Sequence, residues 1–404
     1  MMTRDVQTAA DLIRGGGLVA VPTETVYGLA GSGLSEAAVE EIYRVKGRPE
    51  QKPLSLMVSG PGDIDRYCVR VPEAARILAE KFWPGPLTIV LQAKDLVPAI
   101  VRAGGSTVGL RCPDHPLTLA LLRACDVPLA APSANPSGQP SPKTAAAVAA
   151  YFDGKIAGIL DGGPCGLGRE STIIDMSAAP YRILRQGALP EAELRAALRE
   201  NLTVFGITGG TGCGKTTALQ VIGAMGGLVI DCDEVYHTLG ATSAELREKL
   251  IARFGPAPYA TGVLDTKPIG EIVFRDPKAL AELNAITHSA VKDEIDRRLE
   301  DWAMSGGTLA AIDAIALIES GAAEKCSHLV GITAPKDVRM RRIMARDGIS
   351  EDYARARIES QQPDEFYKQN CDKILENAGT PEAFAAQCKQ YFTEVLQHGK
   401  RKED

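Results

Sequence analysis

Aromatic residues are scarce in this chain of 404 residues. Phe, Tyr and Trp make up 5% of it, whereas hydrophobic residues as a whole make up 45%. Cores with few rings rest on Ala, Leu, Ile and Val, a composition typical of helices packed on a buried sheet. We therefore expect an α/β fold. Because a single core rarely grows past about 250 to 300 residues, the length predicts two or three domains.

The chain also lacks an excess of positive charge. It carries 45 basic and 51 acidic residues, a net charge of −6, which is unfavourable for a protein whose main task is to bind nucleic acid or an anionic membrane. It has no run of 18 apolar residues, and its first residues, 1–8, lack the apolar core of a signal peptide. We expect neither secretion nor a membrane-spanning helix.

Cysteines are present but never close together. There are nine of them, an odd number, and the nearest two, Cys112 and Cys125, are 13 residues apart. This spacing excludes a C-x-x-C metal knuckle and argues against a disulfide framework. We expect reduced cysteines and a cytoplasmic protein.

Short apolar runs alternate with amphipathic stretches through the first half of the chain. Residues 18–21 and 54–58 have the pattern of strands, and residues 35–45 have the pattern of a helix. Such alternation predicts an α/β sheet. A short charged helix that opens at Pro190 marks a boundary. The predicted organisation is a first domain at 1–190, a short helical linker at 191–202 and a second domain at 203–404.

A glycine-rich loop opens the second domain. It follows an apolar stretch at 203–208, precedes a helical pattern and matches G-x-x-x-x-G-K-[ST]. Glycines allow backbone N–H groups to converge on phosphates, while Lys215 reaches the β/γ-phosphates and Thr216 offers an oxygen to Mg²⁺. The sequence predicts an ATP site formed by Gly209, Gly210, Thr211, Gly212, Cys213, Gly214, Lys215, Thr216 and Thr217, with Mg²⁺ as the metal.

Two carboxylates end the next apolar stretch, at Asp231 and Asp233. If the chain stays extended there, both side chains share one face near the phosphate loop, at the edge where open α/β sheets bind ligands. A role in handling Mg²⁺ or the acceptor hydroxyl follows. Alternatively, Asp233 caps the helix after it. Asp313 ends another apolar stretch, as a Walker-B-type aspartate does.

Arginines gather towards the end of the chain. They form either a solvated helix face or a lid that brings planar cations onto a transferring phosphoryl group. A GTPase would carry an Asn-Lys-x-Asp signature, and the sequence has none. The arginines concerned are Arg339, Arg341, Arg342, Arg346, Arg355 and Arg357.

From about Thr203 onwards the chain resembles the dephospho-CoA kinase family. The resemblance rests on the phosphate loop, Asp231-Cys232-Asp233, His288, Glu319, residues 342–346, Arg357 with Gln361, and Asn377-Ala378-Gly379. It implies phosphorylation of the ribose 3′-hydroxyl of dephospho-CoA by ATP, with Asp233 as the acceptor-side base and Arg342 as a catalytic lid residue. The chain departs from the family pattern at Ser289 (usually Pro), Ile315 and Ala316 (usually Pro and Leu) and Arg339 (usually Gln).

In the first half, Lys46 and Arg48 follow the first strong helical pattern. Two cations at i and i+2 of an extended segment point the same way and suit a polyphosphate; alternatively, they complement the helix dipole at a polar helix exit. Small polar groups follow other strands, at Ser133, Asn135 and Ser171. These bind ligand hydroxyls or form turns.

Residues 8–188 resemble the YrdC-like threonylcarbamoyl-AMP synthases. The matching segments are 22–29, 46–48, 83–88, 109–113, 133–135 and 171–175. This resemblance implies synthesis of threonylcarbamoyl-AMP and pyrophosphate from L-threonine, bicarbonate or CO₂, and ATP, as an intermediate in tRNA modification. By resemblance, Lys46 and Arg48 stabilise phosphate charge, Ser133, Asn135 and Arg185 hold the nucleotide, and Thr23, Thr25 and Arg111 hold threonine.

Together these features predict a bifunctional enzyme of α/β class: a YrdC-like twisted mixed sheet with helices, then a P-loop kinase with a parallel sheet and a helical lid. The expected partners are ATP, L-threonine, bicarbonate or CO₂, dephospho-CoA and tRNA-modification proteins, with no membrane and no stable direct nucleic-acid binding. The competing hypothesis is an RNA-binding module at Lys46 and Arg48, fused to another small-molecule P-loop kinase. The acidic net charge and the lack of a basic stripe with aromatics argue against RNA binding.

Overall fold

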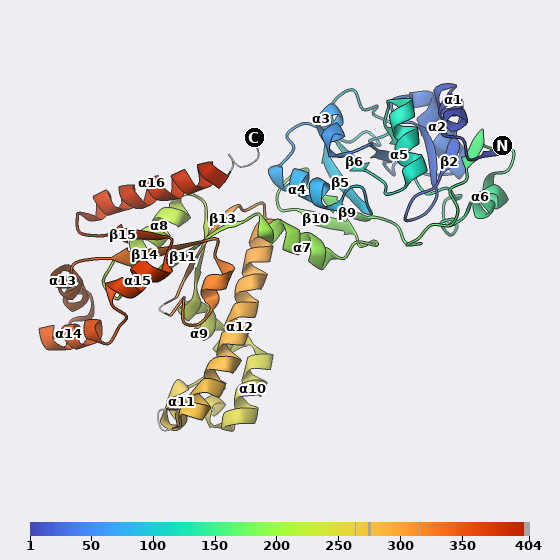
Figure 1. The fold of residues 1–404 in the computed structure, drawn as a ribbon. Helices are drawn as coiled ribbons and strands as arrows, with labels where there is room; N and C mark the ends of the chain where they lie inside the picture. The colour runs from blue at the N-terminus through green and yellow to red at the C-terminus, as the bar shows by residue number, and fades with distance from the viewer. Residues whose placement is uncertain (263, 274–275, 315, 400–404) are drawn as a thin grey trace. The chain divides into compact units, whose positions relative to one another are not determined.

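The computed structural model describes residues 1–262, 264–273, 276–314 and 316–399. The chain divides into two compact units (Figure 1): the first comprises Met1–Glu200 with Met304–Gly306, and the second comprises the rest. The helix predicted as a linker is α7 (Glu191–Glu200), and it packs against α4 (Glu73–Phe82) inside the first unit. Lys81 of α4 and Glu200 of α7 form an ion pair at 2.5 Å.

A ten-stranded mixed sheet forms the centre of the first unit, in the order β1-β8-β2-β3-β7-β4-β6-β5-β9-β10. Parallel and antiparallel pairs occur along it; for example, β4 pairs with β6 in parallel and β5 pairs with β6 antiparallel. The mixed sheet predicted for this half is confirmed. The strands are β1 (Met2–Thr3), β2 (Val19–Val21), β3 (Gly28–Ser32), β4 (Ser55–Met57), β5 (Leu87–Gln92), β6 (Thr107–Arg111), β7 (Leu129–Ala130), β8 (Gly158–Leu160), β9 (Thr172–Asp175) and β10 (Arg182–Arg185).

Helix α2 (Glu36–Lys46) places the first pair of candidate cations. Its N-cap, Ser35, accepts a hydrogen bond from the N–H of Ala38, and Gly47 ends it in the left-handed conformation (φ 58°), which favours glycine. Lys46 is thus the last helical residue, and Arg48 lies beyond the turn. The other helices are α1 (Val6–Arg14), the short η1 (Pro61–Asp63), α3 (Ile64–Tyr67), α5 (Pro116–Cys125) and α6 (Ala145–Phe152).

The second unit has a five-stranded sheet, in the order β12-β13-β11-β14-β15, in which every pair is parallel. Its central strands are almost continuously apolar and buried, as parallel strands covered on both faces are. The predicted parallel-sheet class is confirmed. The strands are β11 (Thr203–Thr208), β12 (Leu228–Asp231), β13 (Leu309–Asp313), β14 (His328–Thr333) and β15 (Lys373–Glu376).

Three groups of helices surround this sheet (Figure 1). Helices α8 (Lys215–Ala224) and α16 (Pro381–Gly399) pack on each other over a core that includes Phe205 and Phe392. A second core joins α9 (Cys232–Thr242), α10 (Ala244–Phe254), η2 (Ala257–Tyr259), α11 (Thr266–Val273) and α12 (Pro277–Met304).

The arginine-rich segment forms the third group. Helices α13 (Lys336–Asp347) and α14 (Glu351–Glu359) pack together through a small apolar core, where the sequence predicts a helical lid. The remaining elements are η3 (Ala322–Lys325) and α15 (Asp364–Asn370). Across the described ranges, the helices are all too short or too polar to cross a membrane.

Candidate active sites

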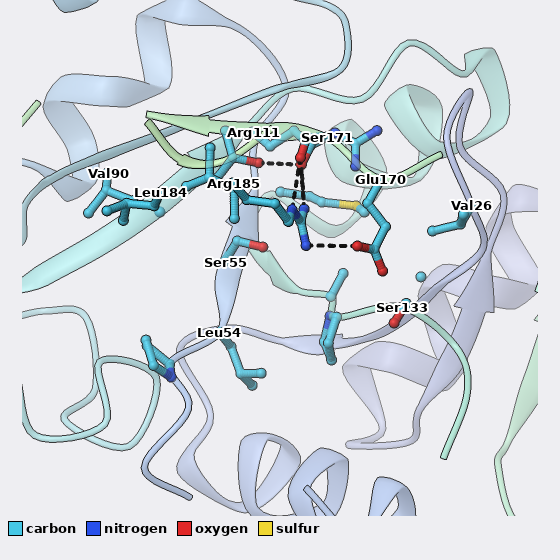
Figure 2. Close-up of a pocket in the computed structure, with 18 of the residues that line it drawn as sticks. Val26, Leu54, Ser55, Val90, Arg111, Ser133, Glu170, Ser171, Leu184 and Arg185 are labelled. Atoms are coloured by element: carbon cyan, nitrogen blue, oxygen red, sulfur yellow. Dashed lines mark hydrogen bonds and ion pairs between the residues drawn. The ribbon is translucent and has the colours of Figure 1, made fainter. Parts of the chain in front are cut away.

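A pocket of about 370 Å³ opens over the sheet of the first unit (Figure 2). Strands β4, β5, β6, β9 and β10 contribute to its wall, together with the segment after β7. Three guanidinium groups line it, those of Arg48, Arg111 and Arg185. Its other polar side chains include Ser55, Thr88, Thr107, Ser133, Glu170, Ser171 and Asp175. A concave site with three cations suits an anionic ligand.

Arg185 is fixed in this wall by four hydrogen bonds. Its Nε and Nη2 donate to the Ser171 carbonyl at 3.0 and 2.9 Å, Nη2 also donates to the Ser171 hydroxyl at 3.1 Å, and Nη1 pairs with Glu170 at 3.1 Å (Figure 2). The hydroxyls of Ser171 and Thr88 lie 2.8 Å apart. Arg185, which was predicted to bind the nucleotide, therefore lines the pocket. Glu170 and Thr88 were not named as site residues, although Thr88 ends the matching segment 83–88 and Glu170 directly precedes Ser171 in the sequence. Their contacts with Arg185 and Ser171 appear only in the fold.

Lys46 and Arg48 do not point the same way. Lys46 is 3% exposed, and its ammonium donates to the carbonyl oxygens of Ser133 and Asn135. Burial, with a smaller contribution from Arg48, lowers the pKa of Lys46 to about 8. Among the described residues, Arg48 lines the pocket and Lys46 does not. The condition for a shared direction, an extended segment, is not met, because Gly47 turns the chain and the Lys46 ammonium contacts the loop at 133–135.

Asn135 belongs to the same buried layer. It is 6% exposed, and its amide donates to the carbonyls of Pro136 and Gln139 at 3.0 and 2.7 Å. Its Oδ1 is buried without a hydrogen-bond partner. Ser133 lies on the pocket wall, whereas Asn135 does not. In the structure, Asn135 shapes the loop that presents Ser133.

The predicted threonine-binding residues form one buried network. The Thr23 and Thr25 hydroxyls share a hydrogen bond of 2.8 Å, and Arg111 donates from Nη2 to Thr25 at 2.7 Å and to Glu24 at 2.8 Å. Arg111 lines the pocket, whereas both threonines are buried outside its wall. The Arg111 Nε is buried without a partner. Thr25 and Glu24 therefore hold Arg111, and Glu24 was missed although it lies between the two threonines.

In the second unit, a pocket of about 320 Å³ lies over the loop between β11 and α8. Lys215 and Thr216 begin α8 after Gly214, which has a φ of 105°. The Lys215 ammonium donates to the Gly209 carbonyl at 2.9 Å. The pocket is lined by Gly210, Thr211, Gly212, Gly214, Lys215, Thr216, Asp313, Arg342, Ile343, Arg346 and Arg357. Of the predicted loop residues, Gly209, Cys213 and Thr217 lie outside its wall.

The two interpretations of the arginine cluster apply to different residues. Arg342 lines the pocket and donates to the Gly212 carbonyl at 3.4 Å and to Asn377 Oδ1 at 3.1 Å. Arg346 and Arg357 also line it, and both pair with Asp347, at 2.6 and 2.7 Å. In contrast, Arg341 and Arg355 form exposed i,i+4 pairs with Asp337 and Glu351.

The two aspartates after β12 have different surroundings. The Asp231 carboxylate accepts hydrogen bonds from the N–H groups of Asp233 and Glu234, at 2.8 and 3.2 Å, and thereby caps α9. The condition for a shared face, an extended chain through Asp233, is not met, because the helix begins at Cys232. The cap is Asp231 and not Asp233. Asp233 instead lines a second pocket of about 310 Å³, together with Tyr236, Asn284, Thr287, His288, Lys292 and others.

Asp313 lies at the carboxyl end of β13, in register with Asp231 on β12. It lines the phosphate-loop pocket, and its Oδ1 is buried without a hydrogen-bond partner. Burial raises the pKa of Asp313 to about 6; Asp231 and Asp233 add to this increase, and Lys215 opposes it. The sequence pattern alone is weak evidence for a role of Asp313, and the fold places this residue in the wall of the phosphate-loop pocket.

Comparison with known proteins matches each half separately. Residues 11–187 match the Sua5/YciO/YrdC family model, described as telomere recombination, and residues 203–382 match the dephospho-CoA kinase model. A dephospho-CoA kinase of Geobacter sulfurreducens is 32% identical over 182 residues, 45% of this chain and 92% of that protein. A threonylcarbamoyl-AMP synthase of Mus musculus is 38% identical over 199 residues, 47% of this chain and 69% of that protein.

The chain belongs to both families. Its first half is of the threonylcarbamoyl-AMP synthase family and its second half of the dephospho-CoA kinase family, as the sequence predicts. A synthase of Pyrococcus abyssi is 45% identical over 195 residues, 48% of this chain. The chain spans 57% of that protein, and 58% and 53% of the synthases of Bacillus subtilis and Schizosaccharomyces pombe.

The four departures from the kinase family pattern lie at different places. Ser289 is exposed on α12, and Ala316 lines the pocket that contains Asp233. Arg339 lies against the phosphate loop, with its Nε 3.0 Å from the Thr211 carbonyl oxygen. Ile315 lies outside the described residues.

Proposed function

We propose that the chain is a bifunctional enzyme. Its first half forms threonylcarbamoyl-AMP and pyrophosphate from L-threonine, bicarbonate or CO₂, and ATP. Its second half transfers a phosphoryl group from ATP to the 3′-hydroxyl of dephospho-CoA. The main support for the first activity is the pocket lined by Arg48, Arg111 and Arg185. The main support for the second activity is the phosphate-loop pocket, which Asp313 lines. The negative charge of Asp233 contributes to the raised pKa of Asp313, so Asp233 lies near this pocket.

In the first reaction the threonine carbamate attacks the α-phosphorus of ATP, and pyrophosphate leaves with the bonding electrons. Negative charge on the phosphates must be stabilised by groups already in place. Arg48 and Arg185 are held for this by carbonyl oxygens, namely those of Lys52 and Pro53 for Arg48 and that of Ser171 for Arg185. Arg111, oriented by Glu24 and Thr25, suits the threonine carboxylate because guanidinium binds carboxylate in a planar fork.

In the second reaction the ribose hydroxyl attacks the γ-phosphorus and ADP leaves. The Asp233 carboxylate orients the hydroxyl and takes its proton. Lys215, Arg342, Arg346 and Arg357 line the pocket that would hold the phosphates, and their charges stabilise the transferring group. Lining the neighbouring pocket, Asp233 is free of the capping hydrogen bonds that occupy Asp231.

We propose Mg²⁺ as the metal of the kinase site. The Thr216 side chain is exposed to the pocket, and Asp313 lines the same pocket with an oxygen that lacks a hydrogen-bond partner. Oxygen ligands suit Mg²⁺, which is usually held by one or two protein groups besides waters and substrate phosphates. The described residues contain no cluster of three or more His, Cys, Asp or Glu that could hold a metal. When bound, the ion would neutralise phosphate charge.

We also propose a cytoplasmic location and transfer of threonylcarbamoyl-AMP to tRNA-modification proteins. All nine cysteines are free thiols, which suits a reducing compartment. Stable RNA binding by the first half is the competing hypothesis. A gel shift with tRNA at increasing salt distinguishes it, since direct phosphate contacts predict a steep loss of affinity with salt.

The decisive experiment is mass spectrometry of the products formed by the purified chain with ATP, L-threonine, bicarbonate and dephospho-CoA. We expect threonylcarbamoyl-AMP, pyrophosphate, CoA and ADP. Omission of threonine should abolish the first pair and leave the second, and omission of dephospho-CoA should do the reverse. Absence of either pair with all substrates present contradicts that half of the proposal.

A further inference from the structure

Arg339 on α13 is a buried cation that covers the phosphate loop. It is 6% exposed, and its Nε donates to the Thr211 carbonyl oxygen at 3.0 Å. A Cβ atom added at Gly210 would lie 2.1 Å from Arg339 Nη2, and one at Gly212 would lie 3.0 Å from the Arg339 carbonyl oxygen. The glycines of the loop therefore allow the lid helix to approach this closely.

Gln361, which follows α14, completes the arrangement. Its Oε1 accepts hydrogen bonds from the Thr211 N–H and from Arg339 Nη2, both at 2.8 Å, and its Nε2 donates to the Thr211 hydroxyl at 2.6 Å. The N–H, carbonyl and hydroxyl groups of Thr211 are all bound. The Asp364 carboxylate lies 3.9 Å from Arg339 Nη1 and balances part of its charge.

A guanidinium suits this position for a geometric reason. It carries five N–H donors in a rigid fork, so Arg339 contacts the Thr211 carbonyl through one nitrogen and Gln361 through another at the same time. A glutamine here would be neutral and would have a single shorter amide. Among the described residues, Arg339 does not line the phosphate-loop pocket. Its influence on a ligand must pass through the loop.

We propose that Arg339 is a positioning residue of the kinase half: with Gln361 it holds Thr211, and so the whole phosphate loop, in the conformation that binds ATP. This inference rests on the proposed kinase function. A loop held in its binding conformation before the ligand arrives loses less conformational freedom on binding. The contribution of Arg339 therefore appears in ATP affinity rather than in the chemical step.

The test compares Arg339→Gln with Arg341→Gln, a matched change on the same helix at an exposed arginine that pairs with Asp337. We expect Arg339→Gln to raise the KM for ATP about tenfold with kcat nearly unchanged, and Arg341→Gln to change neither. Arg339→Lys, which keeps the charge but not the fork, should fall between wild type and Arg339→Gln. Unchanged KM in Arg339→Gln, or a loss confined to kcat or to thermal stability, overturns the proposal.

A double-mutant cycle with Gln361→Ala gives a second test. Because both residues act on Thr211, the double variant should raise the KM for ATP little more than the stronger single variant does. If instead the increase in the KM for ATP in the double variant equals the product of the increases in the two single variants, the proposal is overturned. Threonylcarbamoyl-AMP synthesis by the same samples should be unchanged, which checks that the effect is confined to the kinase half.

Direct ATP binding separates this inference from the proposed function. In calorimetry on the full chain, Lys215→Ala identifies the contribution of the kinase site. If wild type shows Lys215-dependent ATP binding but no transfer to dephospho-CoA, the proposed acceptor is wrong, and the effect of Arg339→Gln on that binding still decides the inference. An unchanged dissociation constant in Arg339→Gln overturns it.

Discussion

The Asp231 carboxylate accepts a hydrogen bond of 2.8 Å from the backbone N–H of Asp233. One aspartate of this pair thereby fixes the start of α9, while the other projects from its first turn into the pocket that contains His288. Two aspartates only two residues apart therefore differ in role: Asp231 caps the helix, and Asp233 lines the pocket. Substitution by asparagine separates them, because an amide still caps a helix but does not accept a proton.

We expect Asp233→Asn to lower the kcat of the kinase reaction by about 10² to 10⁴-fold with little change in ATP affinity. Asp231→Asn should leave kcat close to that of wild type, since Asn caps as well as Asp. Steady-state kinetics with dephospho-CoA and ATP binding, measured for both variants, check this. A silent Asp233→Asn rules out the base assignment, and lost ATP binding with intact chemistry would assign Asp233 to the metal site.

The parts of the kinase site that are contiguous in sequence were predictable. Strand, glycine-rich loop and helix follow one another, so the phosphate loop is recognisable from local pattern alone. The helix cap at Asp231 was also predictable, because Glu234 follows it three residues later, which is a common signature of a helix N-terminus. The tight approach of Arg339 to Thr211 was not, because it joins positions 128 residues apart.

The first half shows the same limit. The segments that matter were found, yet Lys46 contacts carbonyls 87 and 89 residues away, and Arg111 pairs with Glu24 across 87 residues. Whether a cationic side chain points into the pocket or away from it depends on such long-range contacts. The sequence therefore predicts that Lys46 and Arg48 belong to the site, but it does not predict that their roles differ. Arg48 lines the pocket, whereas Lys46 supports the loop at 133–135.

The two activities should be separable by single substitutions. Lys215→Ala removes the ammonium of the phosphate loop and should abolish CoA formation, leaving threonylcarbamoyl-AMP synthesis nearly unchanged. Lys46→Ala should lower threonylcarbamoyl-AMP synthesis, because the carbonyls of Ser133 and Asn135 lose their buried donor and the loop that presents Ser133 loses its support, and it should spare the kinase. Both products are quantified in one reaction. Loss of both activities in a folded single variant contradicts two independent sites.

Metal removal gives a further prediction. Both proposed reactions use ATP, and we expect its phosphates to require neutralisation by a divalent ion. Excess EDTA should stop the release of pyrophosphate and of ADP, and added Mg²⁺ should restore both. Thr216→Val, which deletes a hydroxyl at the phosphate-loop pocket, should raise the Mg²⁺ concentration needed by the kinase alone. Full activity of either half in chelator contradicts its metal assignment.

Asp313 links stability to pH in the second unit. Burial raises its pKa from 3.8 to about 6, so between these values the folded chain holds a proton that the unfolded chain has released. The free energy of unfolding contributed by Asp313 therefore falls as pH rises through this window and stays low above it. Above this window the negative charge of the Asp313 carboxylate lowers the stability of the second unit.

We therefore expect Asp313→Asn, without nucleotide or metal, to raise the Tm of the second unit at pH 8 by a few degrees, since 1 kcal/mol corresponds to roughly 2 to 4 °C in a unit of this size. The gain should shrink at pH 5, where wild-type Asp313 is mostly protonated in the folded state. Kinase activity of the variant should fall about tenfold or more, because a group proposed to hold Mg²⁺ is lost. Calorimetric scans at both pH values check the first point. An equal gain at pH 5 and pH 8 would show that packing, and not the buried charge, is the cause.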